Sequence, residues 1–243
     1  MPIHLKLADR VATVTIDRTH RRNALDLDSL DELHRTVVHA VDEGARALVL
    51  TGADGHFCSG ADLLELEDVS FTSRLAEVLE HLATLPVVTV AAVEGSCMGL
   101  GMQLSVACDV RVVADGARFA VPVARLGLMV DHWTIDRVTR VWGEGAARHM
   151  VLTGAVLDAD DAWRLGAAQV RGGLPEATEV AARAAVLAPL SQSGSKVGFD
   201  ARRDDLAQVA RYEAAFARAW GSDDLAEGRR ASSERREPLF GGR

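Results

Sequence analysis

The sequence predicts an α/β protein with a parallel sheet, followed by a mainly helical segment. Apolar, β-branched runs alternate with stretches of helical periodicity as far as about residue 134, which favours parallel strands joined by helical crossovers. Beyond that point the apolar residues recur mostly at helical spacing. Helices are predicted there at 134–151, 159–166, 175–188 and 204–220.

The elements before residue 134 follow from local signals. Residues 3–7 and 11–16 predict a short hairpin. A helix is predicted over 26–41, with Asp26 or Asp28 as its N-cap. Further strands are predicted at 47–51, 87–93 and 110–114, and further helices from Asp62, from Phe71 to a stop before Pro86, and from Met98 to Cys108.

The composition limits the class of protein. A chain of 243 residues with 48% hydrophobic and 26% charged residues can bury one large core, and its net charge of −8 argues against nucleic acid as a main partner. It has no basic-then-apolar leader and no apolar run of the ~18 residues that span a bilayer, so we expect a cytoplasmic protein with no integral membrane association. Because Cys58, Cys97 and Cys108 lack metal-ligand spacing, we expect buried thiols and no metal site.

Two segments, His56–Leu63 and Gly95–Leu104, each follow an apolar strand and open a predicted helix. A strand that ends in small residues and turns into a helix leaves backbone N–H groups without acceptors. Two such turns side by side form a two-donor cradle for a carbonyl oxygen that gains negative charge. The pattern therefore indicates binding or chemistry at an acyl thioester.

Several motifs accompany these turns in a fixed order: Arg22–Leu25, Phe57–Leu63, Gly95–Leu104, Cys108–Arg111, Met150–Gly154 and Ser222–Phe240. Together they resemble the crotonase family, also called the enoyl-CoA hydratase/isomerase family, over nearly the whole chain. The resemblance implies a spiral of ββα units as the acyl-CoA-binding core (1–190) and a helical oligomerisation segment (191–243). It further implies a trimer or a dimer of trimers, a coenzyme A thioester as substrate or ligand with no other cofactor, and a place in fatty-acid metabolism.

The resemblance also assigns site residues. The oxyanion hole would be the backbone N–H groups of Ala61 and Leu100. Arg21 and Arg22, clustered with Arg18 and His20, would meet the coenzyme A nucleotide or else form a solvated charged loop. Trp133 would add bulk beside the acyl chain or else pack in the core. The other residues implied to bind substrate are Ala24, Gly60, Asp62, Leu63, Gly99 and Val123.

The two glutamates that family hydratases use as acid and base are absent. Their positions are held by Gln103, which can orient a water but cannot take its proton, and by Val123. Asp131 is the remaining carboxylate candidate, as a lone acid or base or as the N-cap of the helix that follows. Two hypotheses follow: a weak or altered hydratase or isomerase that uses Asp131 and Gln103, or a non-catalytic carrier of long-chain acyl-CoA in lipid synthesis.

Overall fold

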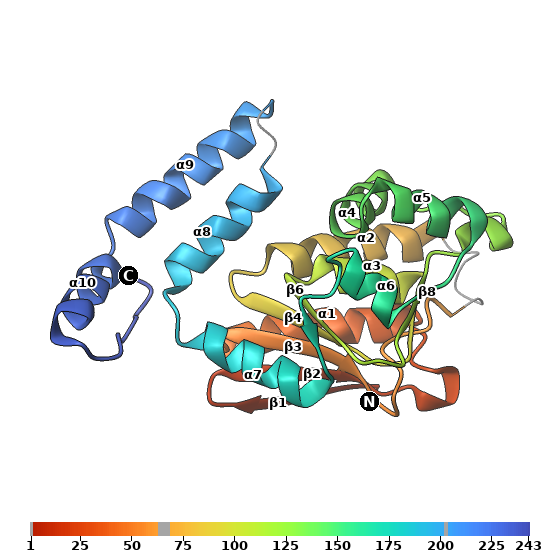
Figure 1. Cartoon of the computed structure of the whole chain (residues 1–243), viewed down its shortest axis with the longest axis horizontal. Coiled ribbons are helices and arrows are strands. Elements are labelled where there is room, and N and C mark those ends of the chain that lie inside the picture. The colour runs from red at the N-terminus through yellow and green to blue at the C-terminus, as the bar shows by residue number, and fades with distance from the viewer. Residues whose placement is uncertain (1, 63–68, 202–203) are drawn as a thin grey trace.

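The computed structural model describes residues 2–62, 69–201 and 204–243. Its centre is a six-stranded sheet in the order β1-β2-β3-β4-β6-β9 (Figure 1). β1 pairs with β2 in antiparallel fashion and the other neighbours are parallel. The α/β prediction is confirmed, as is the hairpin. The strands are Ile3–Ala8, Val11–Ile16, Ala47–Gly52, Val88–Val93, Val110–Val113 and Val170–Arg171.

A second sheet was not predicted. It has three strands in the order β5-β7-β8, which span Ser96–Met98, Arg118–Ala120 and Leu157–Asp158. Strands of two or three residues are too short to display an alternating pattern. The small sheet matters for function because β5 lies inside the second glycine-rich turn.

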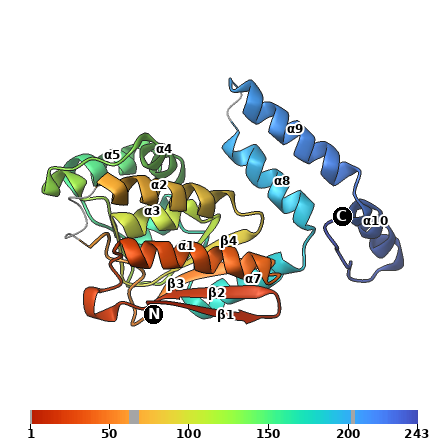
Figure 2. The ribbon, with the colours of Figure 1, turned by 180° about the vertical axis from the view of Figure 1, so that it is seen from behind.

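Helices cover both faces of the main sheet. α1 (Leu27–Asp42) and α3 (Leu100–Ala107) pack against one face, and α2 (Val69–Thr84) packs on both of these helices. α7 (Leu174–Ala185) covers the other face (Figures 1 and 2). Its buried alanines pack there against β3 and β4. Asp26 is the N-cap of α1, and its side chain accepts a hydrogen bond from the Ser29 N–H. This confirms one of the two predicted N-caps, Asp26 and Asp28.

Two helices replace the single one predicted at 134–151. α4 spans His132–Trp142 and α5 spans Glu144–Thr153. Gly143 separates them with a φ of 79°, a conformation that glycine adopts without strain. Three further short elements are η1 (Thr19–Arg21), η3 (Val123–Leu126) and α6 (Ala159–Arg164). The helix predicted to begin at Asp62 falls mainly on 63–68, outside the described residues.

The C-terminal segment forms an arm. α8 (Pro189–Asp200) and α9 (Leu206–Trp220) pack side by side and stand away from the sheet in both ribbon views (Figures 1 and 2). The predicted boundary between residues 190 and 191 falls in the first turn of α8 and stays a prediction. Sequence reasoning missed α8 because its serines and glycines weaken the helical signal.

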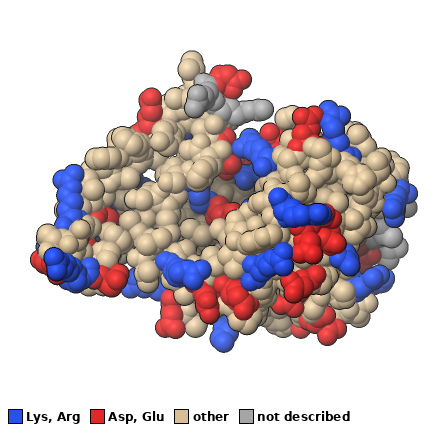
Figure 3. Space-filling view, in the orientation of Figure 1, with Lys and Arg blue, Asp and Glu red and all other residues tan. Residues whose placement is uncertain are grey.

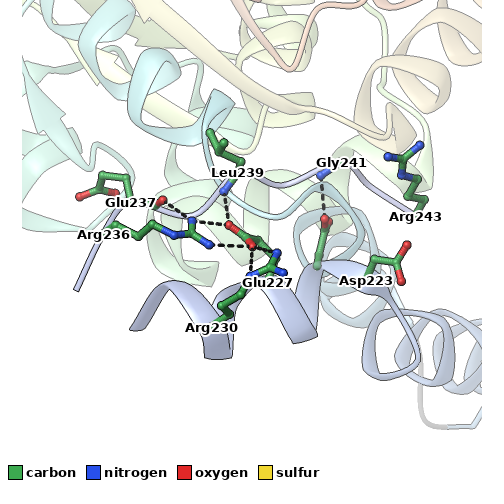
Figure 4. A pocket seen from close by; sticks show the side chains of 9 residues that line it. Asp223, Glu227, Arg230, Arg236, Glu237, Leu239, Gly241 and Arg243 are labelled. Carbon is green, nitrogen blue, oxygen red and sulfur yellow. Dashed lines mark hydrogen bonds and ion pairs between the residues drawn. The ribbon is translucent and has the colours of Figure 1, made fainter. Parts of the chain in front are cut away.

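The chain end folds back on α10 (Asp223–Glu234). Glu227 accepts hydrogen bonds from Arg236 Nη1 (2.6 Å) and from the Leu239 N–H (3.0 Å), and Asp224 accepts from the Gly241 N–H (2.7 Å) (Figure 4). These contacts, the Arg236 guanidinium first among them, hold the pKa of Glu227 below its usual range. The two carboxylates therefore fasten the tail to the helix.

None of the helices in the described ranges is long and apolar enough to cross a bilayer.

Candidate functional site

The two predicted turns lie side by side at the carboxyl ends of β3 and β4. Backbone hydrogen bonds join them directly, from the Phe57 N–H to Glu94 O (2.8 Å), from the Cys58 N–H to Ser96 O (2.9 Å) and from the Met98 N–H to Cys58 O (3.0 Å). Neighbouring parallel strands end at the same edge of a sheet, which is why segments 35 or more residues apart meet here.

Glycines allow the turns to approach each other closely. Gly60 has a φ of 127° and Gly99 a φ of 52°, both in the region that favours glycine. A Cβ at Gly99 would lie 3.9 Å from Gly60 Cα. Even one added methyl group at Gly99 would be in van der Waals contact with Gly60, so the two predicted glycines lie close together.

The N–H groups of Ala61 and Leu100 have no acceptor in the described part of the chain. Leu25 makes both bonds of a parallel bridge, from its N–H to Gly60 O (3.0 Å) and from the Asp62 N–H to its own carbonyl (2.8 Å). The Ala61 N–H therefore points away from Leu25. Leu100 is the first residue of α3, where an N–H has no partner within the helix. Two unpaired donors thus occur on adjoining turns.

A hydrogen-bonded chain connects Gln103 to Asp131. The Gln103 amide nitrogen donates to Thr134 Oγ1 (2.7 Å), and the Thr134 N–H donates to Asp131 Oδ1 (3.0 Å). Gln103 and Thr134 are buried, whereas Asp131 is exposed. Sequence reasoning missed Thr134, since nothing in its surroundings marks it as the partner of a residue 31 positions earlier.

Asp131 is the N-cap of α4, one of the two roles that its sequence position allowed. Its role at a ligand stays a prediction. If capping is its only role, Asp131→Asn should leave the melting temperature and any turnover unchanged, because asparagine also caps helices well. Asp131→Ala should lower the free energy of unfolding by about 1 kcal/mol. Thermal melts of both variants, with turnover measured alongside, check this. Loss of turnover in a stable Asp131→Asn variant would instead make Asp131 a chemical group.

Val123 and Trp133 both lie at the edge of the main hydrophobic core. Val123 begins η3, and both side chains are partly buried against the main hydrophobic core. Trp133 also stacks under the Arg137 guanidinium, 5.2 Å from its ring centre, and lines a cavity of about 380 Å³ between α4 and the arm. Core packing is therefore observed for Trp133, while contact with an acyl chain stays a prediction.

The predicted nucleotide-binding residues gather beside the first turn. Arg21 is half exposed, and its Nε lies 3.9 Å from the Asp62 carboxylate. Arg22 accepts a backbone hydrogen bond from the Ser59 N–H (3.1 Å), and Ala24 is buried. Asp62 thus holds an arginine at the surface. Leu63, predicted to bind substrate, lies outside the described residues.

Arg18 differs from the sequence expectation. Its side chain is only 12% exposed, and it bonds to Ala24 O and to the Asp26 carboxylate. It is therefore not part of the solvated basic cluster with Arg21 and Arg22. Sequence reasoning grouped the arginines by proximity and had no signal for the direction of each side chain.

The three cysteines are free and buried, as predicted. Burial raises the pKa of the Cys58 thiol, beside the first turn, to about 12. A thiol with such a pKa is not ionised near neutral pH, so Cys58 is a poor nucleophile.

The family model for enoyl-CoA hydratase/isomerase matches residues 6–243. The chain belongs to the enoyl-CoA hydratase/isomerase family. A probable enoyl-CoA hydratase, echA6, of Mycobacterium bovis is 38% identical to this family member over 242 residues, covering 99% of each chain.

Another sequence relative and a solved structure agree with this assignment. A crotonyl-CoA hydratase of Syntrophomonas wolfei is 29% identical, with 98% of this chain and 97% of the relative covered. The crystal structure of an enoyl-CoA hydratase from Bacillus anthracis superposes with a TM-score of 0.90 at 26% identity and covers both chains completely. The crotonase fold predicted for this chain, with its helical C-terminal segment, is therefore confirmed.

Proposed function

We propose that this family member binds long-chain acyl-CoA in fatty-acid metabolism and polarises the thioester carbonyl with the N–H groups of Ala61 and Leu100. The observation that carries the proposal is the pair of unpaired donors on adjoining turns. Donors fixed by backbone pairing need no reorganisation when charge develops on a bound oxygen. Gly60 and Gly99 let the two turns approach closely enough to serve one oxygen.

The residues around the cradle limit what it does to the bound thioester. Hydration of an enoyl thioester needs one group to activate water and another to protonate the α-carbon, each contributing about 10²–10⁴ in rate. Gln103 and Val123 stand where we expect the two acids, and neither exchanges protons at neutral pH. We therefore expect slow hydratase or isomerase turnover at most, in which Gln103 orients a water and Asp131 is the single carboxylate.

A non-catalytic acyl-CoA carrier is the second candidate. It is favoured by the contacts of the two polar side chains, since the Gln103 amide is tied to Thr134 and the Asp131 carboxylate caps α4. A carrier needs the oxygen cradle and an apolar chain site but no acid or base. Three buried free thiols suit either candidate in a reducing cytoplasm.

Turnover and binding measured on the same sample separate the two candidates. Crotonyl-CoA and a long-chain enoyl-CoA serve as substrates, and calorimetry with a saturated long-chain acyl-CoA reports binding. An enzyme yields a steady rate that Asp131→Asn or Gln103→Ala reduces. A carrier binds acyl-CoA tightly and shows no rate above the protein-free reaction. Absence of acyl-CoA binding in a folded sample would contradict both candidates.

We further propose a homo-oligomer, a trimer or a dimer of trimers, built through the arm. α9 exposes Leu206, Tyr212, Phe216 and Trp220, and α8 exposes Phe199. Few charged side chains lie along the outer edge of the arm (Figure 3). So much apolar and aromatic surface is costly to leave in water. Light scattering should give a mass of three or six chains of 26.0 kDa, and a stable monomer at micromolar concentration would contradict this.

A further inference from the structure

Arg18 lies beneath the first turn and is largely buried. Its guanidinium donates to Ala24 O through Nη1 and to Asp26 Oδ2 through Nη2. Its backbone N–H donates to Asn23 Oδ1 (2.9 Å). The guanidinium is planar and its donors are rigidly spaced, so a buried arginine that donates to two acceptors holds both in a fixed geometry. Arg18 therefore fixes the residues immediately before and after Leu25.

Leu25 in turn holds the residues on both sides of Ala61. Its N–H donates to Gly60 O (3.0 Å), and its carbonyl accepts from the Asp62 N–H (2.8 Å). The Asp62 carboxylate lies 4.0 Å from Arg18 Nη2, so the same guanidinium also faces the far side of the turn. The direction of the Ala61 N–H thus depends on Leu25, which Arg18 fixes on both sides.

The charge of Arg18 also reaches the turn. Burial raises the pKa of the Cys58 thiol, and the positive charge of Arg18 acts against that rise. Burial alone would raise the pKa of Asp26, yet its hydrogen bonds to Ser29 and the Arg18 charge lower it below the usual value. Arg18 therefore acts on groups on both of the segments that it joins.

We infer that Arg18 is a positioning residue for the oxyanion hole: it holds the Ala61 N–H in line with the Leu100 N–H and supplies positive charge beneath the bound carbonyl oxygen. The inference rests on the proposed function, because it assumes that these two donors bind a thioester oxygen. It gives this arginine a role distinct from that of the exposed Arg21 beside it, whose side chain can meet a ligand directly.

The test measures the thioester carbonyl group of a bound ligand. Difference infrared spectroscopy of a saturated acyl-CoA carrying ¹³C at the thioester carbon reports how strongly the protein polarises that bond. The wild-type chain should shift the band to lower frequency. In Arg18→Met the shift should fall by more than half, and calorimetric affinity for the same acyl-CoA should weaken about two- to tenfold, as expected when one backbone hydrogen bond is lost. Arg18→Lys keeps the charge but not the fork, so its band should lie between the two.

Arg74→Met is the matched control. Arg74 is a similarly paired arginine of α2 that reaches Asp31 on α1 (2.6 Å) and also pairs with Glu77 on its own helix (2.8 Å). The Arg74→Met variant should have a lower melting temperature but an unchanged carbonyl band. This comparison separates an effect of Arg18 on the oxyanion hole from a general loss of stability. If Arg18→Met does not fold, the intermediate band of Arg18→Lys carries the test.

The possible failures are distinguishable. A folded Arg18→Met or Arg18→Lys variant with the wild-type band and affinity would overturn the role of Arg18 and leave the proposed function intact. A wild-type chain that binds acyl-CoA without shifting the band would overturn the proposed oxyanion hole, and the role of Arg18 with it.

Discussion

Replacing Gln103 and Val123 together by glutamate should raise the hydration rate of crotonyl-CoA by at least about 10², since each general acid or base contributes about 10²–10⁴. The surroundings accommodate both changes. In Gln103→Glu the contact with Thr134 Oγ1 survives with its direction reversed, because the threonine hydroxyl can donate to a carboxylate. In Val123→Glu the new side chain begins at a partly buried position and keeps access to solvent.

Each single variant is the control for the double one. Gln103→Glu alone should raise the hydration rate less than the double variant does, because hydration needs a second proton-transfer group on the other side of the double bond. A double variant that is folded, binds acyl-CoA and hydrates no faster than the wild type would show that the missing acids do not limit the rate. Wild-type turnover of about 10² per second, typical of efficient enzymes, would show that other residues do the chemistry.

Gly101→Ala should lower the free energy of unfolding by about 3 kcal/mol or more, at the upper end of the range for overpacked sites. A Cβ at Gly101 would lie 2.2 Å from Cys58 O and 2.9 Å from Cys58 Cβ. The obstacle is largely backbone that is paired between the two turns, so no side-chain rotation relieves the clash. The turns must separate, which should also weaken acyl-CoA binding.

Gly145→Ala is the control for this substitution. Gly145 lies in α5 and has no atom within 4 Å of an added Cβ. Replacing it by alanine should leave the free energy of unfolding unchanged or raise it slightly. Thermal melts of the two variants provide the comparison. Equal melting temperatures for Gly101→Ala and the wild type would mean that the turns do not approach each other this closely.

Long and strongly patterned elements of the fold were predictable from the sequence. The β1–β2 hairpin, the strands β3, β4 and β6, and the Asp26 cap of α1 all follow from local signals that the structure retains. Features without a local signal were not predictable. The small sheet depends on pairs of very short strands, and the break at Gly143 depends on one backbone conformation inside a continuous helical pattern.

The candidate site also has features that were predictable from the sequence and features that were not. The meeting of Gly60 with Gly99 follows from two strands that end at one edge of a sheet, so motif order was enough to predict it. The contact of Gln103 with Thr134 and the burial of Arg18 depend on side-chain directions across tertiary contacts. Sequence spacing carries no information on those directions, and both residues became candidates for a role in the site only in the folded structure.

The most direct test of the central claim, a thioester cradle formed by the Ala61 and Leu100 N–H groups, is a calorimetric comparison of three ligands. These are a long-chain acyl-CoA, the thioether analogue in which CH₂ replaces the carbonyl, and free coenzyme A. The thioester should bind about tenfold or more tightly than the thioether, which loses two hydrogen bonds of about 1 kcal/mol each. The thioether should still bind more tightly than free coenzyme A, because burying the acyl chain contributes about 0.8 kcal/mol per CH₂. Equal affinity for thioester and thioether would contradict the claim.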